Sequence, residues 1–423
     1  MKASSSVLFR IAARNVLRHR RRTLITAIVL TVGIAVFIMF QSLLAGMDRV
    51  TIDAAIDYDS SSISLRSKEF QEFNSGSDPL FKNIAIKEPK AIEDRLPALL
   101  PKGSMWTHRT RFYVQVSNWI DETPALAFAV EPEKDKEVFK TAGTVVQGAW
   151  VSATKAVIGL DLAKDLGVRV GNLIALTAIL PDGSLNAIEL EVGGIADIPL
   201  FSLSQQAIYL SAQDAEALVG APLPVNEIDI RLPPALQLDT IVAQSDAAAK
   251  TLEKTFGGIE AISIGEAMCD YLAMRNMKSK FAYIVVVIVL LISAVGIFNT
   301  ILMSMYSRIR EIGVLAADGL EPGQIKRLFS LEGMLIGVIG SAGGILLGAV
   351  FVWWLTSHGI AFGGMFGNLD LGNLPKNLLI KGEWNPLTFI QGFSFGVLVS
   401  WLASVMPARK ASHIEVTEAL RFV

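Results

Sequence analysis

The charged residues with the most informative spacing directly follow an apolar stretch. Arg308, Arg310 and Glu311 come just after the apolar run that ends at Met305, and small and apolar residues continue to Gly319. Mixed charge beside an apolar stripe is typical of a short amphipathic helix that docks into a groove of a partner protein. An ordinary basic loop is the alternative, and the pattern favours the docking element. Its candidate contact residues are Arg308, Arg310, Glu311, Ile312, Gly313, Leu315, Asp318 and Gly319.

The sequence gives little support for enzymatic chemistry. No Gly-Lys pair is followed by Ser or Thr, so no phosphate-binding loop of that kind is predicted. The four histidines are isolated, and the HExxH zinc motif does not occur. The GxSxG pattern at 392–396 lies inside the apolar stretch 387–406, not at the strand-to-helix turn that a nucleophile motif needs. Acidic and basic residues that alternate between Glu131 and Lys140 are typical of a solvated face. We therefore expect no catalytic residues, no metal site and no cofactor bound by this chain.

Four apolar stretches must position the docking element. They run over 23–44, 281–305, 328–355 and 387–406, and Glu332 is the one charged residue within them. A helix of about 20 apolar residues crosses the roughly 30 Å hydrocarbon core of a bilayer. Hydrophobic residues make up 52% of the chain and charged residues only 18%, which also favours an integral membrane protein.

The charges are distributed unevenly along the chain. Residues 48–280 contain 22 Lys and Arg against 32 Asp and Glu, whereas the rest contains 16 against 8. Basic residues precede the first apolar stretch, lie between the second and third, and follow the fourth. The positive-inside rule therefore predicts cytoplasmic termini and a cytoplasmic 306–327 loop, with the large insert and the 357–386 loop outside. We expect a multi-pass protein of the bacterial inner membrane.

The predicted fold class is an α-helical membrane protein with four transmembrane helices and a mixed α/β extracytoplasmic domain inserted between helices 1 and 2. The predicted segments are a basic amphipathic helix (1–22), span 1 (23–45), the external domain with stalk helices (46–280), span 2 (281–305), the cytoplasmic loop (306–327), span 3 (328–356), an external loop (357–386), span 4 (387–406) and a cytoplasmic tail (407–423).

The insert combines short β-rich runs with helical patterns. We predict strands at 62–65, 111–116, 125–130, 173–179, 188–192 and 228–232, and helices at 91–99, 159–166, 212–219 and 238–256. If residues 265–305 form one helix, it measures about 60 Å, roughly twice the hydrocarbon thickness. Such a helix would serve as a stalk for the external domain.

Span 3 contains glycines in helical register. Gly340, Gly344 and Gly348 form one row, and Gly333, Gly337 and Ser341 form a second. Small residues four positions apart let helices approach closely in lipid. The rows could face span 4 of the same chain or a second subunit, and internal packing is the favoured interpretation.

Several segments along the chain resemble one family of transporters. The run Asn299-Thr300-Ile301-Leu302-Met303-Ser304, followed by Arg308-Ile309-Arg310-Glu311-Ile312-Gly313-Val314-Leu315 and Glu332-Gly333, is similar to the permease module of the MacB/FtsX superfamily of ABC transporters. The segments 13–23 and 407–421 resemble the start and the close of that module, and 159–172 with 192–195 resembles its extracytoplasmic core. In length and arrangement the chain looks most like the lipoprotein-releasing LolC/LolE type.

The resemblance implies a permease subunit without its own ATPase. It would pair with a second permease, identical or related, and with two cytoplasmic ABC ATPase subunits that bind ATP. It implies mechanotransmission and extraction of lipoproteins from the outer leaflet for transfer to a periplasmic carrier. The candidate cargo contacts near the external end of span 1 are Phe37, Met39, Phe40 and Leu44. A MacB-like exporter of peptides or small amphiphiles and an FtsX-like regulator of a cell-wall hydrolase are the alternatives.

Overall fold

A computed structural model of the chain describes residues 5–18, 20–68, 85–180, 183–235, 237–317, 320–361 and 379–413. The chain divides into two compact units. The first comprises Met1–Met47, Met274–Ile360 and Ile380–Val423, and the second comprises Asp48–Ala273 and Ala361–Leu379. We call them the helical unit and the α/β unit.

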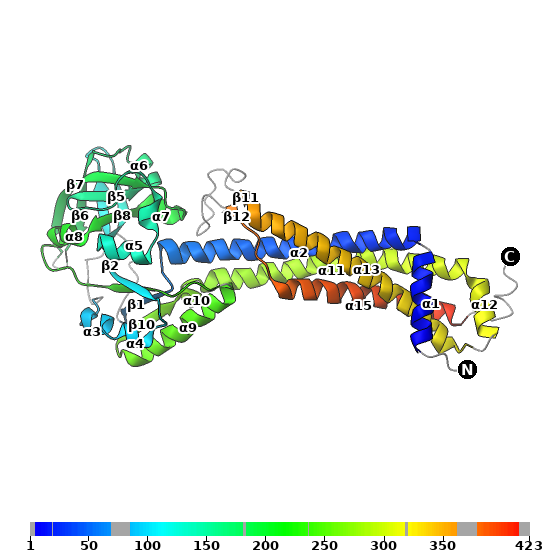
Figure 1. Cartoon of the computed structure of the whole chain (residues 1–423). Helices are drawn as coiled ribbons and strands as arrows, with labels where there is room; N and C mark the ends of the chain where they lie inside the picture. The colour runs from blue at the N-terminus through cyan, green and yellow to red at the C-terminus, as the bar shows by residue number, and fades with distance from the viewer. Residues whose placement is uncertain are drawn as a thin grey trace. The chain divides into compact units, whose positions relative to one another are not determined.

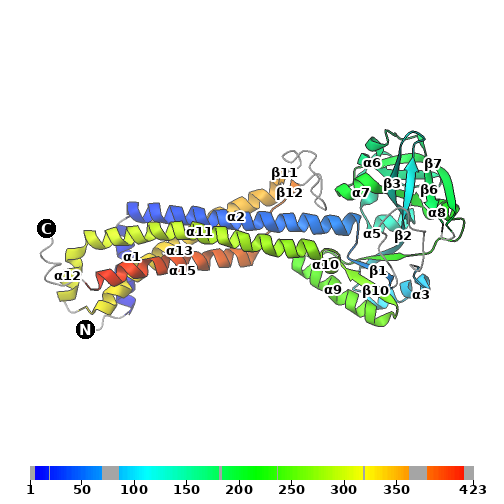
Figure 2. The same cartoon turned by 180° about the vertical axis from the view of Figure 1, so that it is seen from behind.

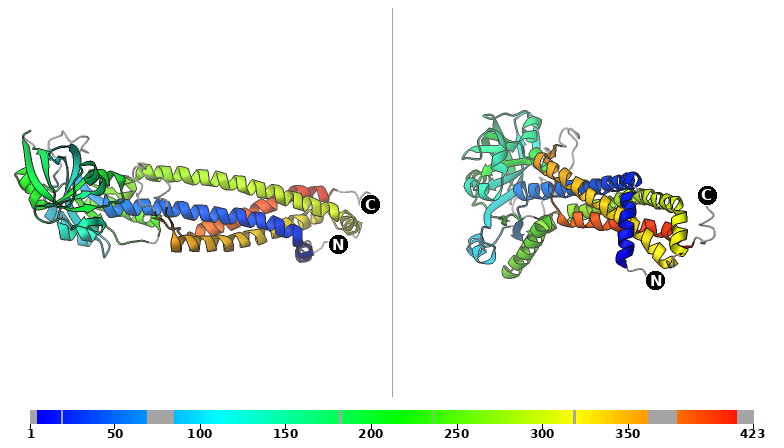
Figure 3. Two further views of the ribbon diagram at one scale, coloured as in Figure 1. Left: turned by 90° about the horizontal axis from the view of Figure 1, so that it is seen from above. Right: turned by 45° about the vertical axis from the view of Figure 1, so that its right-hand side comes forward.

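The helical unit is a bundle of four long helices with two short ones at one end (Figure 1). The long helices lie side by side in the view from behind as well (Figure 2). The amphipathic helix α1 runs across the end of this bundle rather than along it (Figure 3). The helices are α1 (Ser5–Arg18), α2 (Arg20–Tyr58), α11 (Cys269–Ser307), α12 (Ile309–Ala317), α13 (Pro322–His358) and α15 (Pro386–Ala411).

Local sequence explains where two of the long helices begin. Pro322 and Pro386 occupy the first helical turn, where a missing N–H costs nothing. Glu321 caps α13, and its side chain and that of Gln324 satisfy each other's backbone N–H groups in a capping box. The Asn385 side chain accepts a hydrogen bond from the Leu387 N–H at 3.0 Å. In the described part of the chain, four helices are long and apolar enough to cross a membrane, which agrees with the predicted number of spans.

Both glycine rows of α13 pack within this chain. A Cβ on Gly344 would lie 2.7 Å from Ile34 Cβ of α2, and Gly340 and Gly348 face α2 in the same way. A Cβ on Gly333 or Gly337 would instead meet Ser404 or Ser400 of α15. The row of Gly340, Gly344 and Gly348 therefore faces span 1, and only the second row faces span 4.

The α/β unit is built around one ten-stranded sheet. Its strands are β1 (Ile63–Ser67), β2 (Met105–Ser117), β3 (Glu122–Val130), β4 (Val145–Gly148), β5 (Lys155–Gly159), β6 (Leu173–Ile179), β7 (Leu185–Ala196), β8 (Ala207–Ser211), β9 (Glu227–Arg231) and β10 (Ile259–Ser263). Its helices are α3 (Pro89–Glu93), α4 (Leu96–Leu99), α5 (Pro132–Val138), α6 (Leu160–Asp165), α7 (Phe201–Gln206), α8 (Ala212–Val219), α9 (Leu238–Thr255) and α10 (Ile264–Ala267), with a 3-10 turn at Thr141–Thr144. Two short strands, β11 (Ile360–Ala361) and β12 (Leu379–Ile380), pair separately.

Six strands of this sheet close into a ring. The order is β2-β3-β8-β5-β7, and β6 closes it by pairing with both β7 and β2. Side chains such as Phe112, Ile158 and Leu190 fill the interior as one apolar core. The remaining strands, in the order β10-β1-β9, extend the sheet from the first half of β2, and α3, α4 and α9 cover that part.

The structure confirms the predicted strands at β1, β2, β3, β6, β7 and β9, and the predicted helices at α6, α8 and α9. The predicted 91–99 helix is instead two short helices. Residues 265–305 were also expected to form one helix. A break between α10 and α11 moves the start of the long helix to Cys269, and its 39 residues extend about 58 Å.

Candidate functional site

An ion pair joins the start of α12 to α13. Arg308 lies in the turn between α11 and α12, and its Nη1 is 3.1 Å from Glu332 Oε1. Its Nε donates to Glu311 Oε2 at 2.9 Å, and Asn15 Nδ2 of α1 donates to Glu332 Oε1 at 2.7 Å. We call Asn15, Arg308, Glu311 and Glu332 the polar hub. Helices α1, α12 and α13 and the turn between α11 and α12 thus meet through one set of hydrogen bonds and ion pairs.

The central Arg308–Glu332 pair of the hub is buried, whereas the Glu311 side chain is 49% exposed. Arg308 is 7% exposed and Glu332 is 3% exposed. Burial by itself lowers the pKa of Arg308, but the Glu332 charge and the hydrogen bonds to both carboxylates outweigh it and raise the pKa. Arg308 therefore stays charged. A buried ion pair with satisfied hydrogen bonds fixes geometry more than it adds stability.

An apolar cluster surrounds the hub. The Arg308 guanidinium lies 5.8 Å from the centre of the Phe329 ring. The buried members of this cluster are Val16, Ile297, Ile301, Met305, Ile312, Ile325, Phe329, Ile336, Ala408 and Ala411. They come from α1, α11, α12, α13 and α15. Displacement of α12 would therefore disturb every other helix in the cluster.

The structure divides the predicted docking residues between two faces of α12. Ile309, Ile312 and Gly313 are buried, whereas Arg310 and Val314 are exposed on the other side. Ile312, one of the predicted docking residues, does not lie on the exposed face, because its side chain belongs to the core of the helical unit. Helix α12 runs through Gly313 without a break. The side chain of Leu315 and residues Asp318 and Gly319 lie outside the described part of the chain.

The amphipathic helix α1 lies against protein. Leu8, Ala12 and Val16 are buried, and α1 packs on α13. The apolar stripe of this basic amphipathic helix therefore faces the helix bundle. Arg10 and Arg14 remain exposed on the opposite side.

A second charge network anchors the end of α2 inside the α/β unit. Asp57 pairs with Arg231 of β9 and, at 2.7 Å, with Lys140. Asp59 Oδ1 is 3.0 Å from Arg111 Nη1 of β2. Close by, apolar residues of α2 pack against α9, α10 and the start of α11 in a buried cluster: Ile52, Ala55, Ile56, Leu238, Ile241, Ile264, Met268 and Tyr271.

The interior of this network includes two buried carboxylates on β9, Glu227 and Asp229. Arg111 and Arg66 both contact Glu227, at 2.6 Å each. Asp229, two residues along β9, accepts from Ser64 Oγ at 2.6 Å and is fully buried. Burial and the neighbouring Glu227 charge raise the pKa of Asp229 to about 7. The strand therefore carries one firmly charged carboxylate and one that titrates near neutrality.

The candidate cargo contacts on α2 differ in exposure. Phe37 is 4% exposed and packs with Val286 and Leu290 of α11, and its ring centre is 6.5 Å from that of Tyr283. The prediction that Phe37 contacts cargo does not fit this arrangement. Phe40 is 39% exposed, and Met39 and Leu44 are partly exposed.

Sequence reasoning missed the role of Asn15 and noted Glu332 only as a charge in a span. The signal was available, because an ionisable residue inside an apolar stretch calls for a partner. Among the described residues, no group of His, Cys, Asp and Glu could hold a metal ion.

Two family models match the chain. One, described as MacB-like periplasmic core domain, matches residues 23–248, and the other, described as FtsX-like permease C-terminal, matches residues 283–416. An uncharacterized ABC transporter permease of Methanocaldococcus jannaschii is 24% identical over 440 residues, which cover 100% of this chain and 98% of that protein.

Other relatives match parts of the chain. The lipoprotein-releasing system transmembrane protein LolC of Neisseria meningitidis serogroup B is 22% identical over 285 residues, 63% of this chain and 64% of LolC. The macrolide export ATP-binding/permease protein MacB of Nitrosomonas europaea is 26% identical over 186 residues, 42% of this chain and 25% of MacB.

Solved structures also match. The extracellular domain of the ABC-type transporter YknZ from Gram-positive bacteria has a TM-score of 0.30 at 12% identity, covering 48% of this chain and 99% of that chain. The four membrane-length helices and the periplasmic-type domain describe a membrane protein with an extracellular domain. Because one family model alone spans more than half of the chain, the protein belongs to the FtsX-like ABC transporter permeases that carry a MacB-like periplasmic core domain.

Proposed function

We propose that this permease subunit transmits the motion of a separate ABC ATPase to its α/β unit, and that it thereby extracts lipoproteins from the outer leaflet of the inner membrane. The observation that carries the mechanical part is the buried Arg308–Glu332 ion pair. It ties the helix that would meet the ATPase to α13, and the hydrogen bond from Asn15 ties it to α1.

The first step takes place at α12. Its exposed Arg310 and Val314 offer a cation and an apolar side chain to a groove on a cytoplasmic ATPase dimer, which binds the ATP. On the opposite face of α12, Ile312 belongs to the apolar cluster and Ile309 is buried as well. A push on α12 is therefore passed to the hub as displacement, because close-packed interiors compress little.

The second step uses the long helices. Both α2 and α11 contribute residues to the helical unit and to the α/β unit. In the α/β unit the end of α2 is held by the ion pairs of Asp57 and Asp59. Tyr271 Oη of α11 donates to Asp48 Oδ1 at 2.8 Å, so the two helices are fastened to each other there.

The proposed orientation of the protein in the membrane rests on the distribution of basic and acidic residues along the chain. Basic residues flank the spans on the side of α1 and α12, and the α/β unit belongs to the acidic insert. The positive-inside rule then places both termini and α12 in the cytoplasm and the α/β unit outside the inner membrane.

We propose that the cargo and the second permease contact the apolar faces of α2 and α11. Large apolar side chains on both helices are more than 45% exposed: Leu24, Ile25, Ile28, Val32, Phe281, Ile284, Val285, Ile288, Leu291, Ile292 and Val295. An acyl chain or the span of a second permease, identical or related, would cover them. Similarity to LolC supports lipoprotein release and transfer to a periplasmic carrier.

Depletion of the protein in its own bacterium tests the cargo. Acylated lipoproteins are fractionated between inner and outer membranes, and we expect them to accumulate in the inner membrane. Re-expression of the wild-type chain should restore sorting, and the Arg310→Glu variant should not. Normal sorting after depletion would refute lipoprotein release, and stimulated ATPase activity would then be assayed with peptides and amphiphiles.

Export of peptides or small amphiphiles is the second candidate. The similarity to MacB supports it. It predicts that depletion raises the sensitivity of cells to amphiphilic compounds while lipoprotein sorting stays normal.

A further inference from the structure

Strand β2 extends beyond its neighbour β3. The pairing of β2 with β3 starts at Arg109, which lies opposite Val130. The preceding residues Met105–His108 pair with β9 on one edge, and no described strand pairs with their other edge. Pro132 turns the chain into α5 directly after β3 ends. In an extended strand, alternate residues direct their N–H and C=O groups to opposite edges, so two of these four residues present both groups to the open side.

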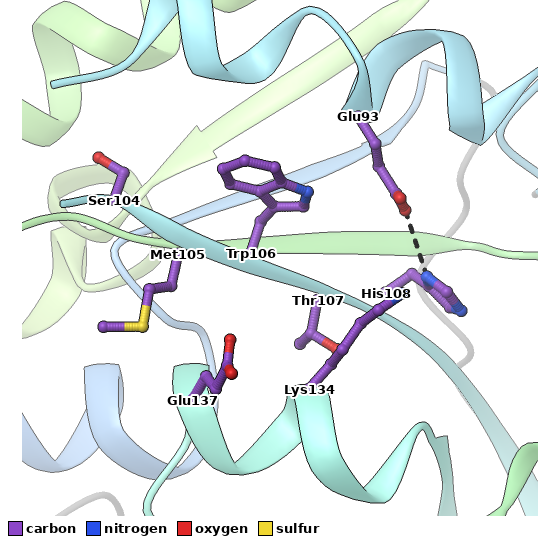
Figure 4. Close-up of a pocket in the computed structure, with 8 residues that line it drawn as sticks. All are labelled: Glu93, Ser104, Met105, Trp106, Thr107, His108, Lys134 and Glu137. Atoms are coloured by element: carbon purple, nitrogen blue, oxygen red, sulfur yellow. Dashed lines mark hydrogen bonds and ion pairs between the residues drawn. The ribbon is translucent and has the colours of Figure 1, made fainter. Parts of the chain in front are cut away.

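A cavity of about 290 Å³ lies along this open edge (Figure 4). Helix α3 borders it on one side of the strand and α5 on the other. Trp106 points toward α3, whereas Met105 and Thr107 point toward α5. The residues that line it are Glu93, Ser104, Met105, Trp106, Thr107, His108, Lys134 and Glu137. Residues from both helices and from the strand thus form a slot beside unpaired backbone.

A buried hydroxyl group in the slot has no partner. Thr107 is 1% exposed, and its Oγ1 forms no hydrogen bond with the described residues. A buried polar atom without a partner costs free energy that a suitable ligand recovers. Thr107 therefore adds a side-chain group to the backbone groups of the open edge.

The charged groups of the slot favour a basic ligand. Glu93 Oε1 already has a partner in His108 Nδ1, at 3.2 Å. Lys134 Nζ forms an ion pair with Glu131 Oε2, at 2.8 Å. Glu137 is exposed and forms no ion pair with the described residues. Trp106 lies on the other side of the strand, where it packs against the apolar cluster of α3, α4 and α9, so Glu137 is the group that would meet the cation.

We propose that an extended segment of a partner protein adds to the open edge of β2 as an extra strand, with a Lys or Arg side chain directed to Glu137. The segment would lie beside residues 105–108 of β2, in the position that β3 would occupy if it continued beyond Val130. Four residues of β2 provide about 13 Å of edge at 3.4 Å per residue, enough for a segment of four or five residues. Backbone hydrogen bonds provide the affinity and the carboxylate selects the basic side chain. This inference does not depend on the identity of the transported cargo.

The test uses the full-length protein in an uncharged detergent. The probe is a fluorescein-labelled, acetylated seven-residue peptide of alternating valine and lysine, followed by fluorescence anisotropy. We expect saturable binding, and hydrogen exchange should show new protection of the amides within Met105–His108. The same peptide with alternate backbone nitrogens methylated cannot form the ladder, and we expect its binding to be lost.

Matched variants on α5 test the charge. Glu137→Lys should weaken binding three- to ten-fold, whereas Glu133→Lys, whose side chain is 87% exposed on the same helix, should leave it within two-fold. Both positions are on the surface, so circular dichroism should show the wild-type fold. Equal binding of the methylated peptide, equal effects of the two variants, no protection of Met105–His108, or no binding at 1 mM peptide would each overturn the proposal.

Discussion

At the scale of single residues, the buried carboxylate of Asp229 makes stability depend on pH. Its pKa is raised to about 7 from the ordinary 3.8, first by burial and then by Glu227. Between pH 4 and 7 the folded protein therefore holds a proton that the unfolded chain has lost. The folded state binds more protons, so the free energy of unfolding falls as pH rises through this window.

Asp229→Asn should abolish this dependence. The amide oxygen still accepts from Ser64, and no charge opposes Glu227. We expect the variant to exceed the wild type in unfolding free energy by about 1–3 kcal/mol at pH 8 and to match it near pH 4. Denaturant unfolding of the full chain in detergent measures this, with the exposed Asp165→Asn as control. An unchanged pH slope in the Asp229 variant would contradict the assignment.

The polar hub gives a second prediction at this scale. Arg308→Met leaves the Glu332 carboxylate buried without its cation, and we expect a loss of about 3 kcal/mol. The double variant Arg308→Met with Glu332→Leu replaces the pair by apolar side chains and should recover most of that loss. Coupling to ATP hydrolysis should fail in both. Thermal unfolding and stimulated ATPase activity separate the two effects, and a double variant as unstable as the single one would refute the pairing.

At the scale of elements, the exposed face of α12 predicts that a variant there should lose stimulated ATP hydrolysis and still fold normally. Arg310→Glu reverses a surface charge that faces away from the apolar cluster, so membrane insertion and stability should not change. Stimulated ATP hydrolysis by the assembled complex should fall at least five-fold. Arg10→Glu on the exposed face of α1 is the matched control. Full stimulation with Arg310→Glu would exclude α12 as the ATPase contact.

The close contact of α13 with α2 gives another prediction for elements. A side chain at Gly344 must push Ile34 and the Thr31 carbonyl, because a Cβ there lies within 2.7 Å and 3.1 Å of them. We expect Gly344→Leu to destabilise the helical unit by about 2–4 kcal/mol through overpacking. Gly296 of α11 has nothing within 4 Å of its would-be Cβ, so Gly296→Leu should be tolerated. The melting temperatures of the two variants in detergent provide the comparison.

At the scale of the whole molecule, the apolar faces of α2 and α11 predict a second permease subunit. Ile292 is 64% exposed on α11, whereas Ile297 of the same helix is fully buried. In a Cys269→Ser background, Ile292→Cys should form an intermolecular disulfide in membranes under mild oxidation, and Ile297→Cys should not. Gel electrophoresis without reductant shows the covalent pair, and the masses of the product distinguish an identical from a related partner. Absence of any adduct from cysteines placed along this face would count against dimerisation through α11.

The sequence by itself determined the features that depend on local pattern. The number of spans follows from apolar length, and strand β6 and helix α8 have the bounds that periodicity predicts. The position of the short helix α12 follows from charged residues directly after an apolar run. These signals are short in sequence, so they need no knowledge of what packs against them.

Tertiary structure alone decided which groups meet. The hydrogen bond between Asn15 and Glu332 joins residues 317 positions apart, and no local pattern encodes it. Long-range packing likewise decides that β6 closes the ring by pairing with both β2 and β7. It also decides that Ile312 and Phe37 are buried. An apolar residue on an amphipathic helix suits a partner or a core equally well, and only the packed chain shows which of them it contacts.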